Sequence, residues 1–291
     1  MEHKDKILIT TDLNEKSLET NLNYTRFLTK KFGSKVSLIH VVEEAGFFSK
    51  LFGESSKDAV ELLEKKFRKL AKNIEKEYGF ELEEVIKYGR VTKEIADYAN
   101  EKKFDLIITG TSNSGDREKN IGANTHRLIR IAECPVLTLH NDITPKDIKN
   151  ILLPIELFVS SRQKVKNAVE WAESFGSKIT VLASALEDND GEARNKIKLI
   201  ANNTKRFILK QGLECDLVML GGIKDRNEFA RGVIDYANDE LNKVDMIMVM
   251  GKDESADFFM NSTAQFIISA SKQPVLCVPL RKSGMSLTAI F

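Results

Sequence analysis

The sequence predicts an α/β protein made of two tandem Rossmann-like domains, each a five-stranded parallel sheet with helices on both faces. Two observations support this prediction. Short apolar runs alternate with longer segments of helical periodicity along the whole chain, which is the pattern of repeated βαβ units. Several short segments also recur about 140 residues later in the same order, and such self-similarity indicates a duplication.

The duplication is visible in matched pairs of segments. Phe32-Gly-Ser-Lys35 recurs as Phe175-Gly-Ser-Lys178, and Asp97-Tyr-Ala-Asn100 recurs as Asp235-Tyr-Ala-Asn238. Pro145 lies in a polar stretch between the two series, where a boundary is expected. We therefore predict a first copy at residues 1–143, a second copy at 148–281 and a C-terminal tail at 282–291.

In the first copy, apolar runs predict strands at residues 6–11, 36–42, 82–87, 105–109 and 135–139. Helical periodicity predicts helices at about 15–32, 57–78, 91–102 and 122–132. Leu18, Leu22 and Leu28 form a one-sided apolar stripe on the first helix, and Gly33 follows as a stop signal. Because strands alternate with helices, right-handed crossovers give a parallel sheet that is covered on both faces.

The second copy repeats this plan. Its strands are predicted near residues 150–155, 178–184, 214–220, 245–250 and 275–279, and its helices near 160–175, 190–211, 226–242 and 261–271. Residues 43–56 interrupt the pattern in the first copy with large apolar side chains such as Phe47 and Phe52. We expect this loop either to pack on the neighbouring domain or to form a lid over a ligand.

The composition restricts the function. Lys and Arg number 44 against 43 Asp and Glu, so the chain lacks the basic excess that bulk binding of nucleic acid requires. No apolar run approaches the roughly 20 residues that span a bilayer, and the N-terminus lacks the core of a signal peptide. Cys134, Cys215 and Cys277 show no metal-ligand spacing. We expect no nucleic acid, membrane or metal site, and a reducing cytoplasmic location.

The junction between the apolar run at 105–110 and the helix that begins near Gly122 is the best candidate for a ligand site. At such a junction the free backbone N–H groups and the helix dipole both favour an anion. Thr10, Thr11 and Asp12 end the first strand. There a carboxylate can accept hydrogen bonds from a ribose or base, or it can cap the helix that follows.

Taken together, these features resemble the universal stress protein family. The resemblance rests on the opening Ile7-Leu-Ile-Thr-Thr-Asp12, on His40-Val-Val42 at the end of the second strand, and on Gly122-Ala-Asn-Thr125 followed by Cys134-Pro-Val-Leu137. It covers almost the whole chain as two copies. It implies a fold like that of the adenine nucleotide alpha hydrolases, pairing through the last strands, and a stress-response role in which some members bind ATP and others do not.

The nucleotide-binding class carries Gly-x2-Gly-x9-Gly-[Ser/Thr], whose glycines and hydroxyl hold phosphates. The strand-one Asp and the residue after the strand-two His hold ribose and adenine. The resemblance therefore implies that ATP or another adenine nucleotide, with Mg²⁺ possible beside it, binds in the first copy. The cofactor-binding residues are then Thr10, Thr11, Asp12, Val41, Gly110, Asn113, Gly115, Gly122, Ala123, Asn124 and Thr125. No catalytic residue is assigned.

Both copies depart from this motif. In the first, Asn113 replaces a glycine that asparagine can mimic in left-handed conformations. Ala123 replaces the Ser/Thr hydroxyl, at a cost of about 0.5–1.5 kcal/mol for the lost hydrogen bond. In the second copy Glu156 replaces the strand-one Asp, and Glu254 stands at the second-glycine position. A carboxylate beside a triphosphate opposes binding, so we predict that the second copy does not bind ATP.

These patterns support three hypotheses. The first is a cytoplasmic regulatory binding module whose two copies form an intramolecular pseudo-dimer through the strands at 135–139 and 275–279, with further pairing into a homodimer. The second is an interaction scaffold without nucleotide, which binds an unknown protein partner. The third is a slow ATPase or adenylyl transferase, because the same sheet serves such enzymes.

Overall fold

The computed structural model describes residues 4–13, 15–43, 56–111, 122–141, 143–157, 163–187, 190–251 and 262–280. Their contacts divide the chain into two compact units, with the division between Pro145 and Lys146. The first copy forms one unit and the second copy forms the other. Most of the predicted loop at 43–56 and the whole tail at 282–291 lie outside the described residues. No helix in the described part of the chain is long and apolar enough to cross a membrane.

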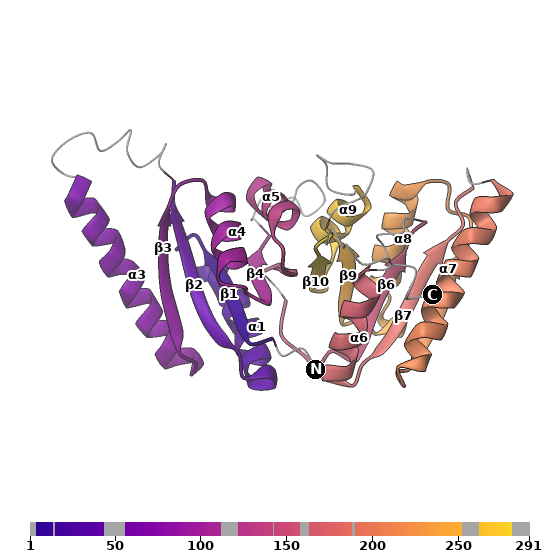
Figure 1. Cartoon of the computed structure of the whole chain (residues 1–291), viewed down its shortest axis with the longest axis horizontal. Helices are drawn as coiled ribbons and strands as arrows, with labels where there is room; N and C mark the ends of the chain where they lie inside the picture. The colour runs from indigo at the N-terminus through magenta and orange to yellow at the C-terminus, as the bar shows by residue number, and fades with distance from the viewer. Residues whose placement is uncertain are drawn as a thin grey trace. The chain divides into compact units, whose positions relative to one another are not determined.

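The strands of the first copy form a doubly wound parallel sheet (Figure 1). They are β1 (Lys6–Thr11), β2 (Lys35–Val42), β3 (Leu82–Tyr88), β4 (Leu106–Gly110) and β5 (Val136–Leu139). Their order is β3-β2-β1-β4-β5, and these neighbours pair in parallel. From β1 the chain adds β2 and β3 on one side and then β4 and β5 on the other, which makes the position between β1 and β4 the switch point where such sheets bind ligands.

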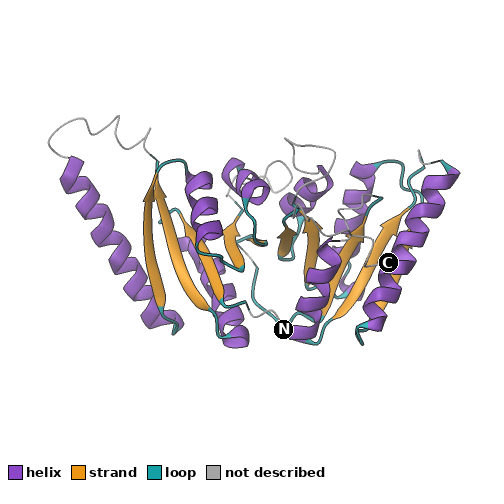
Figure 2. Cartoon of the chain, viewed as in Figure 1, coloured by secondary structure: helices purple, strands orange, loops and turns teal. Residues whose placement is uncertain are grey.

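Helices cover both faces of this sheet, as Figure 2 shows. They are α1 (Glu15–Phe32), α3 (Ser56–Tyr78), α4 (Val91–Glu101) and α5 (Ala123–Ile131). α1 contacts α3, and α4 contacts α5. Right-handed crossovers place their helices on the opposite face of the sheet once strands are added on the other side of β1. The two pairs of helices therefore lie on opposite faces. The predicted fold of the first copy is confirmed.

The second copy has the same architecture. Its strands are β6 (Asn150–Ile155), β7 (Lys178–Ser184), β8 (Cys215–Leu220), β9 (Met246–Met250) and β10 (Val275–Val278). Its helices are α6 (Gln163–Phe175), α7 (Gly191–Lys210), α8 (Arg226–Asn238) and α9 (Ser262–Ala270). The strand order is β8-β7-β6-β9-β10, which reproduces the order of the first copy and confirms the tandem fold.

Each sheet supplies the core of its unit. Ile7, Leu8 and Ile9 of β1 are fully buried, as are Ile151 and Leu152 of β6. Consecutive residues are buried because both faces of a parallel sheet are covered, and this explains why the strands read as continuous apolar runs.

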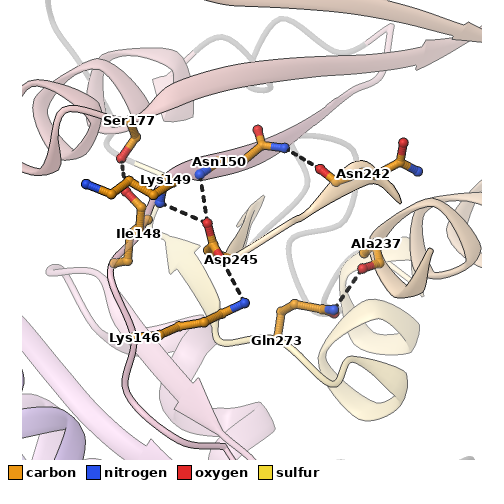
Figure 3. Close-up of polar contacts among 9 residues, drawn as sticks. All are labelled: Lys146, Ile148, Lys149, Asn150, Ser177, Ala237, Asn242, Asp245 and Gln273. Carbon is orange, nitrogen blue, oxygen red and sulfur yellow. Dashed lines mark hydrogen bonds and ion pairs between the residues drawn. The ribbon is translucent and has the colours of Figure 1, made fainter. Parts of the chain in front are cut away.

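A carboxylate clamp joins strand ends at the amino edge of each sheet. In the second copy, Asp245 Oδ2 accepts hydrogen bonds from the backbone N–H of Lys149 at 2.8 Å and of Asn150 at 2.9 Å. Its Oδ1 lies 2.6 Å from Lys146 Nζ (Figure 3). In the first copy, Asp105 accepts one such bond at 3.0 Å, from the first residue of β1. The clamp holds two neighbouring strands in register, on the edge opposite the strand ends where ligands bind.

Candidate functional site

The predicted residues at the end of β1 lie at the carboxyl edge of the first sheet. Thr10 Oγ1 donates to a threonine hydroxyl of β4 at 2.9 Å. Thr11 Oγ1 accepts from the N–H of Leu13 at 2.9 Å, and the Thr11 carbonyl lies 3.0 Å from His40 Nδ1. Leu13 has a φ of 66°, an uncommon conformation that signals local strain. This turn leaves Asp12 exposed to solvent beside the strand ends.

The predicted strand-to-helix junction forms between Gly110 and Thr125. Gly110 ends β4 and Gly122 is the N-cap of α5. Thr125 Oγ1 donates to the Gly110 carbonyl at 3.1 Å, so this buried hydroxyl ties the two ends of the loop together. Gly122 has no side-chain oxygen, so the N-cap residue itself makes no side-chain bond to the first N–H groups of α5. Asn113 and Gly115 lie outside the described residues.

A cavity of about 500 Å³ lies at the same end of the first copy. It is lined by Glu43, Arg90, Val91, Thr92, Lys93, Asn124 and Arg127. Its volume falls in the usual range for small-molecule sites, about 300–1,000 Å³. Asn124 links the cavity to the predicted site, and Glu43 follows β2 two residues after the buried Val41.

The cavity is positively charged. Arg90, Lys93 and Arg127 line it, against one carboxylate, Glu43. The Lys93 ammonium lies 2.6 Å from Asp97, which neutralises its charge. Neither arginine has a carboxylate partner in the described part of the chain. Two unpaired guanidinium groups therefore remain, and such groups bind phosphates and carboxylates.

The turn between β3 and α4 sets the position of Arg90. Gly89 has a φ of 144°, and its N–H donates to the Val42 carbonyl at 3.0 Å. A Cβ at this glycine would lie 2.9 Å from Glu94 Oε1. Arg90 follows as the N-cap of α4 and makes no side-chain capping bond. Glycine thus permits a turn that brings an arginine and an uncapped helix N-terminus to the cavity.

His126, on the first turn of α5, is half-buried. Burial lowers its pKa below the ordinary value, and the charges of Arg130 and Arg127 act in the same direction. The imidazole is therefore neutral at physiological pH and adds no further positive charge beside the cavity.

At the corresponding place in the second copy, the protein's own polar groups pair with one another. Glu156 follows β6 and accepts from Thr263 Oγ1 of α9 at 3.3 Å. Lys164, on the first turn of α6, is 2% exposed. Its burial lowers the pKa of its ammonium to about 8, opposed by the charge of Glu156. Ser184 donates to the Leu220 carbonyl at 3.1 Å. Glu254 lies outside the described residues.

α8 of the second copy also differs from α4 at its N-terminus. The N-cap of α8 is Asp225, whose Oδ1 accepts from the N–H of Asn227 at 2.7 Å and of Glu228 at 2.9 Å. A carboxylate therefore takes the helix N–H groups that have no side-chain cap in α4.

Of the seven residues that line the cavity, the sequence reasoning named only Asn124 as a site residue and missed the other six: Glu43, Arg90, Val91, Thr92, Lys93 and Arg127. The available signal was Gly89-Arg90-Val91, a glycine and a cation at the start of a predicted helix that has no Ser, Thr, Asp or Asn at its cap. Nothing in the sequence pattern distinguishes the buried Lys164 from an exposed lysine, because lysine side chains are rarely buried.

Comparisons with known proteins agree with this fold. The profile described as "Universal stress protein family" matches residues 4–140. A universal stress protein of Methanocaldococcus jannaschii is 32% identical over 139 residues, covering 46% of this chain and 81% of that protein. One of Bacillus subtilis is 27% identical over 149 residues, covering 46% and 97%. The crystal structure of a universal stress protein from Archaeoglobus fulgidus shares the fold, with a TM-score of 0.74 and 17% identity over 96% of this chain and 98% of that chain. The chain therefore belongs to the universal stress protein family.

Proposed function

We propose that this protein is a binding and regulatory module that holds an adenine nucleotide in its first copy. The observation that carries the proposal is the positively charged cavity of about 500 Å³ at the carboxyl edge of the first sheet. Ligands of doubly wound sheets bind at this edge, outside the switch point. The cavity shares Asn124 with the predicted nucleotide site.

Different site residues would bind different parts of the nucleotide. Asp12 is exposed at the end of β1, where a carboxylate can accept bonds from ribose hydroxyls. Val41 would bind adenine through its backbone. The N–H groups of Ala123 and Asn124 at the start of α5, which the N-cap Gly122 cannot cap with a side chain, would hold phosphate oxygens, as helix N-termini do. Mg²⁺ would accompany ATP and would partly neutralise the charge of its phosphates.

We propose further that the second copy does not bind nucleotide. Glu156 and Thr263 pair with each other at the equivalent strand end, and Lys164 is buried beside them. Asp225 caps α8 with a carboxylate. An incoming phosphate would meet these anions and would have to displace existing hydrogen bonds.

Isothermal titration calorimetry with ATP and Mg²⁺ tests this function. Asp12→Ala should weaken binding by about 10-fold or more, the effect of losing a charge-assisted hydrogen bond. Glu156→Ala is the matched control at the equivalent strand end and should leave binding unchanged. The proposal fails if ATP gives no heat with the wild-type protein and Asp12→Ala alters no ligand response.

An interaction scaffold remains the second candidate because two large apolar side chains are exposed at one edge of the first copy. Leu62 on α3 is 55% exposed and Tyr88 at the end of β3 is 38% exposed. β3 is also the last strand of its sheet on that side, and such edges bind other chains. A crystal grown with ATP in which the space between Val41 and Gly110 is vacant would favour the scaffold.

A further inference from the structure

Arg90 and Arg127 line one cavity from two different helices, and neither is paired with a carboxylate in the described part of the chain. We infer that they form an anion subsite that makes the first copy select ligands with a chain of two or more phosphates. The inference rests on the proposed nucleotide function, because it assigns a position to the phosphate tail of that ligand.

The cavity offers backbone donors as well as guanidinium groups. Arg90 is the N-cap of α4, and neither its side chain nor Gly122 at the N-cap of α5 makes a capping bond. The N–H groups in the first turn of each helix therefore receive no hydrogen-bond acceptor from the side chain of the N-cap residue. Val91, Thr92 and Lys93 of α4 and Asn124 of α5 line the same cavity. An anion there would satisfy these donors and neutralise the two arginines at the same time.

In the second copy, side chains of the protein itself accept the N–H groups at the N-terminus of the corresponding helix, α8. Asp225 accepts two N–H bonds of α8, and Glu228 Oε2 accepts from the N–H of Lys224 at 2.8 Å. The arrangement is similar to a capping box, except that Glu228 bonds the residue before the N-cap rather than the N-cap itself. The first copy has a cation at the N-cap of α4, which is unfavourable beside the positive end of the helix dipole. An anionic ligand in the cavity would account for an arginine at the N-cap of α4, a position where a carboxylate would stabilise the helix more.

The size and charge of the cavity define the class of ligand. A volume of about 500 Å³ exceeds what a single inorganic phosphate fills. Guanidinium groups on separate helices can each take two oxygens of a different phosphate. Glu43 reduces the positive charge of the cavity, but neither arginine forms an ion pair with it or with any other carboxylate among the described residues. A nucleoside di- or triphosphate fits this arrangement better than a nucleoside or monophosphate.

Calorimetry with adenosine, AMP, ADP and ATP, together with melting curves in sodium tripolyphosphate, tests the subsite in the full chain. For the wild-type protein, affinity should rise with each added phosphate. Arg127→Ala should weaken ATP binding by about 10-fold and AMP binding by far less. Arg90→Asp is the decisive variant, because it supplies α4 with a carboxylate cap. It should fold with equal or higher melting temperature and should lose the preference for ATP over AMP.

Arg68→Ala and Arg68→Asp are matched controls for charge, since Arg68 lies on α3 with its guanidinium 3.6 Å from Glu64. Both variants should bind adenosine, AMP, ADP and ATP with the same order of affinity as the wild-type protein. If AMP and ATP bind equally, or Arg90→Asp binds ATP like the wild type, the subsite is wrong while the nucleotide function stands. If no adenine nucleotide binds but tripolyphosphate stabilises the wild type and not Arg90→Asp, the nucleotide function is wrong and the subsite stands.

Discussion

Lys164 is a lysine whose ammonium group is almost completely buried, with 2% of the side chain exposed. Burial lowers its pKa to about 8 in the folded protein, against roughly 10.4 in an unfolded chain. Between these values the unfolded chain binds one more proton, so the stability of the second copy rises as the pH rises through this window. Below about pH 8 both states are protonated, and the full cost of burying the charge remains.

Lys164→Met should therefore stabilise the second copy at about pH 7, by roughly 2–3 kcal/mol. The gain should shrink as the pH approaches about 10, where the wild-type lysine is neutral in the folded state. Urea unfolding at several pH values measures both effects. Lys166→Met is the control two residues along the same helix, since Lys166 is exposed and its ion pair with Glu170 spans 3.7 Å. A destabilised Lys164→Met variant whose stability depends on pH like that of the wild type would contradict a lowered pKa for Lys164.

The two clamp residues allow a paired test of burial. Asp245 is 7% exposed and holds two backbone N–H groups and Lys146. Asp105 is half-buried and holds one backbone N–H. Asp245→Ala should cost about 3 kcal/mol because it leaves buried donors unpaired, whereas Asp105→Ala should cost about 1 kcal/mol. Urea unfolding of the two variants gives the comparison. Equal costs would show that burial does not strengthen the clamp.

At the scale of the elements, the β3–α4 turn connects backbone strain to ligand binding. Gly89→Ala forces an alanine to a φ of 144° and into contact with Glu94, at a cost of roughly 1–3 kcal/mol. The turn should relax and displace Arg90, so ATP affinity should fall along with stability. Gly191→Ala is the control, because this first residue of α7 has no positive φ and no atom within 4 Å of the added Cβ. Unchanged ATP affinity in Gly89→Ala would show that the conformation of the β3–α4 turn does not affect ATP binding.

The helices and strands themselves could be predicted closely from the sequence. β1, β6 and α1 have the predicted bounds, because buried parallel strands are continuous apolar runs and the stripe of α1 has a clear helical period. The predicted helix at 226–242 instead ends at Asn238 and continues as a separate 3-10 helix, Glu240–Asn242. Asp239 caps that short helix by accepting from the N–H of Leu241 at 3.0 Å, a local competition that periodicity does not reveal.

The site was less predictable than the fold. Motif positions identified Asp12, Gly110 and Gly122, which lie at strand ends and a helix start as expected. Arg90 was missed because its role depends on a turn of Gly89 and on the packing of α4 against α5. Such proximity arises from the crossover topology, and residues brought together in this way carry no fixed spacing in the sequence.

At the scale of the whole molecule, the difference between the copies predicts a stoichiometry. Native mass spectrometry of the full chain at saturating ATP should show one nucleotide per chain. The first copy combines a charged cavity with two helix N-termini that their N-cap side chains leave uncapped, whereas Asp225 caps α8 in the second copy. Two nucleotides per chain would contradict the prediction for the second copy. The same spectrum reports whether chains pair, which bears on the predicted pseudo-dimer and homodimer.

Each clamp lies at the edge of its sheet opposite the carboxyl ends of the strands, where the proposed ligand would bind in the first copy, and this separates stability from recognition. A change at the carboxyl edge leaves the bonds of Asp105 or Asp245 untouched. The second copy combines the more extensive clamp with strand ends where Glu156 and Thr263 pair with each other. We therefore expect that exchanging strand-end loops and helix caps changes the ligand specificity of either copy without changing its fold. Chimaeric chains with two binding copies, or with none, should be obtainable on an unaltered framework.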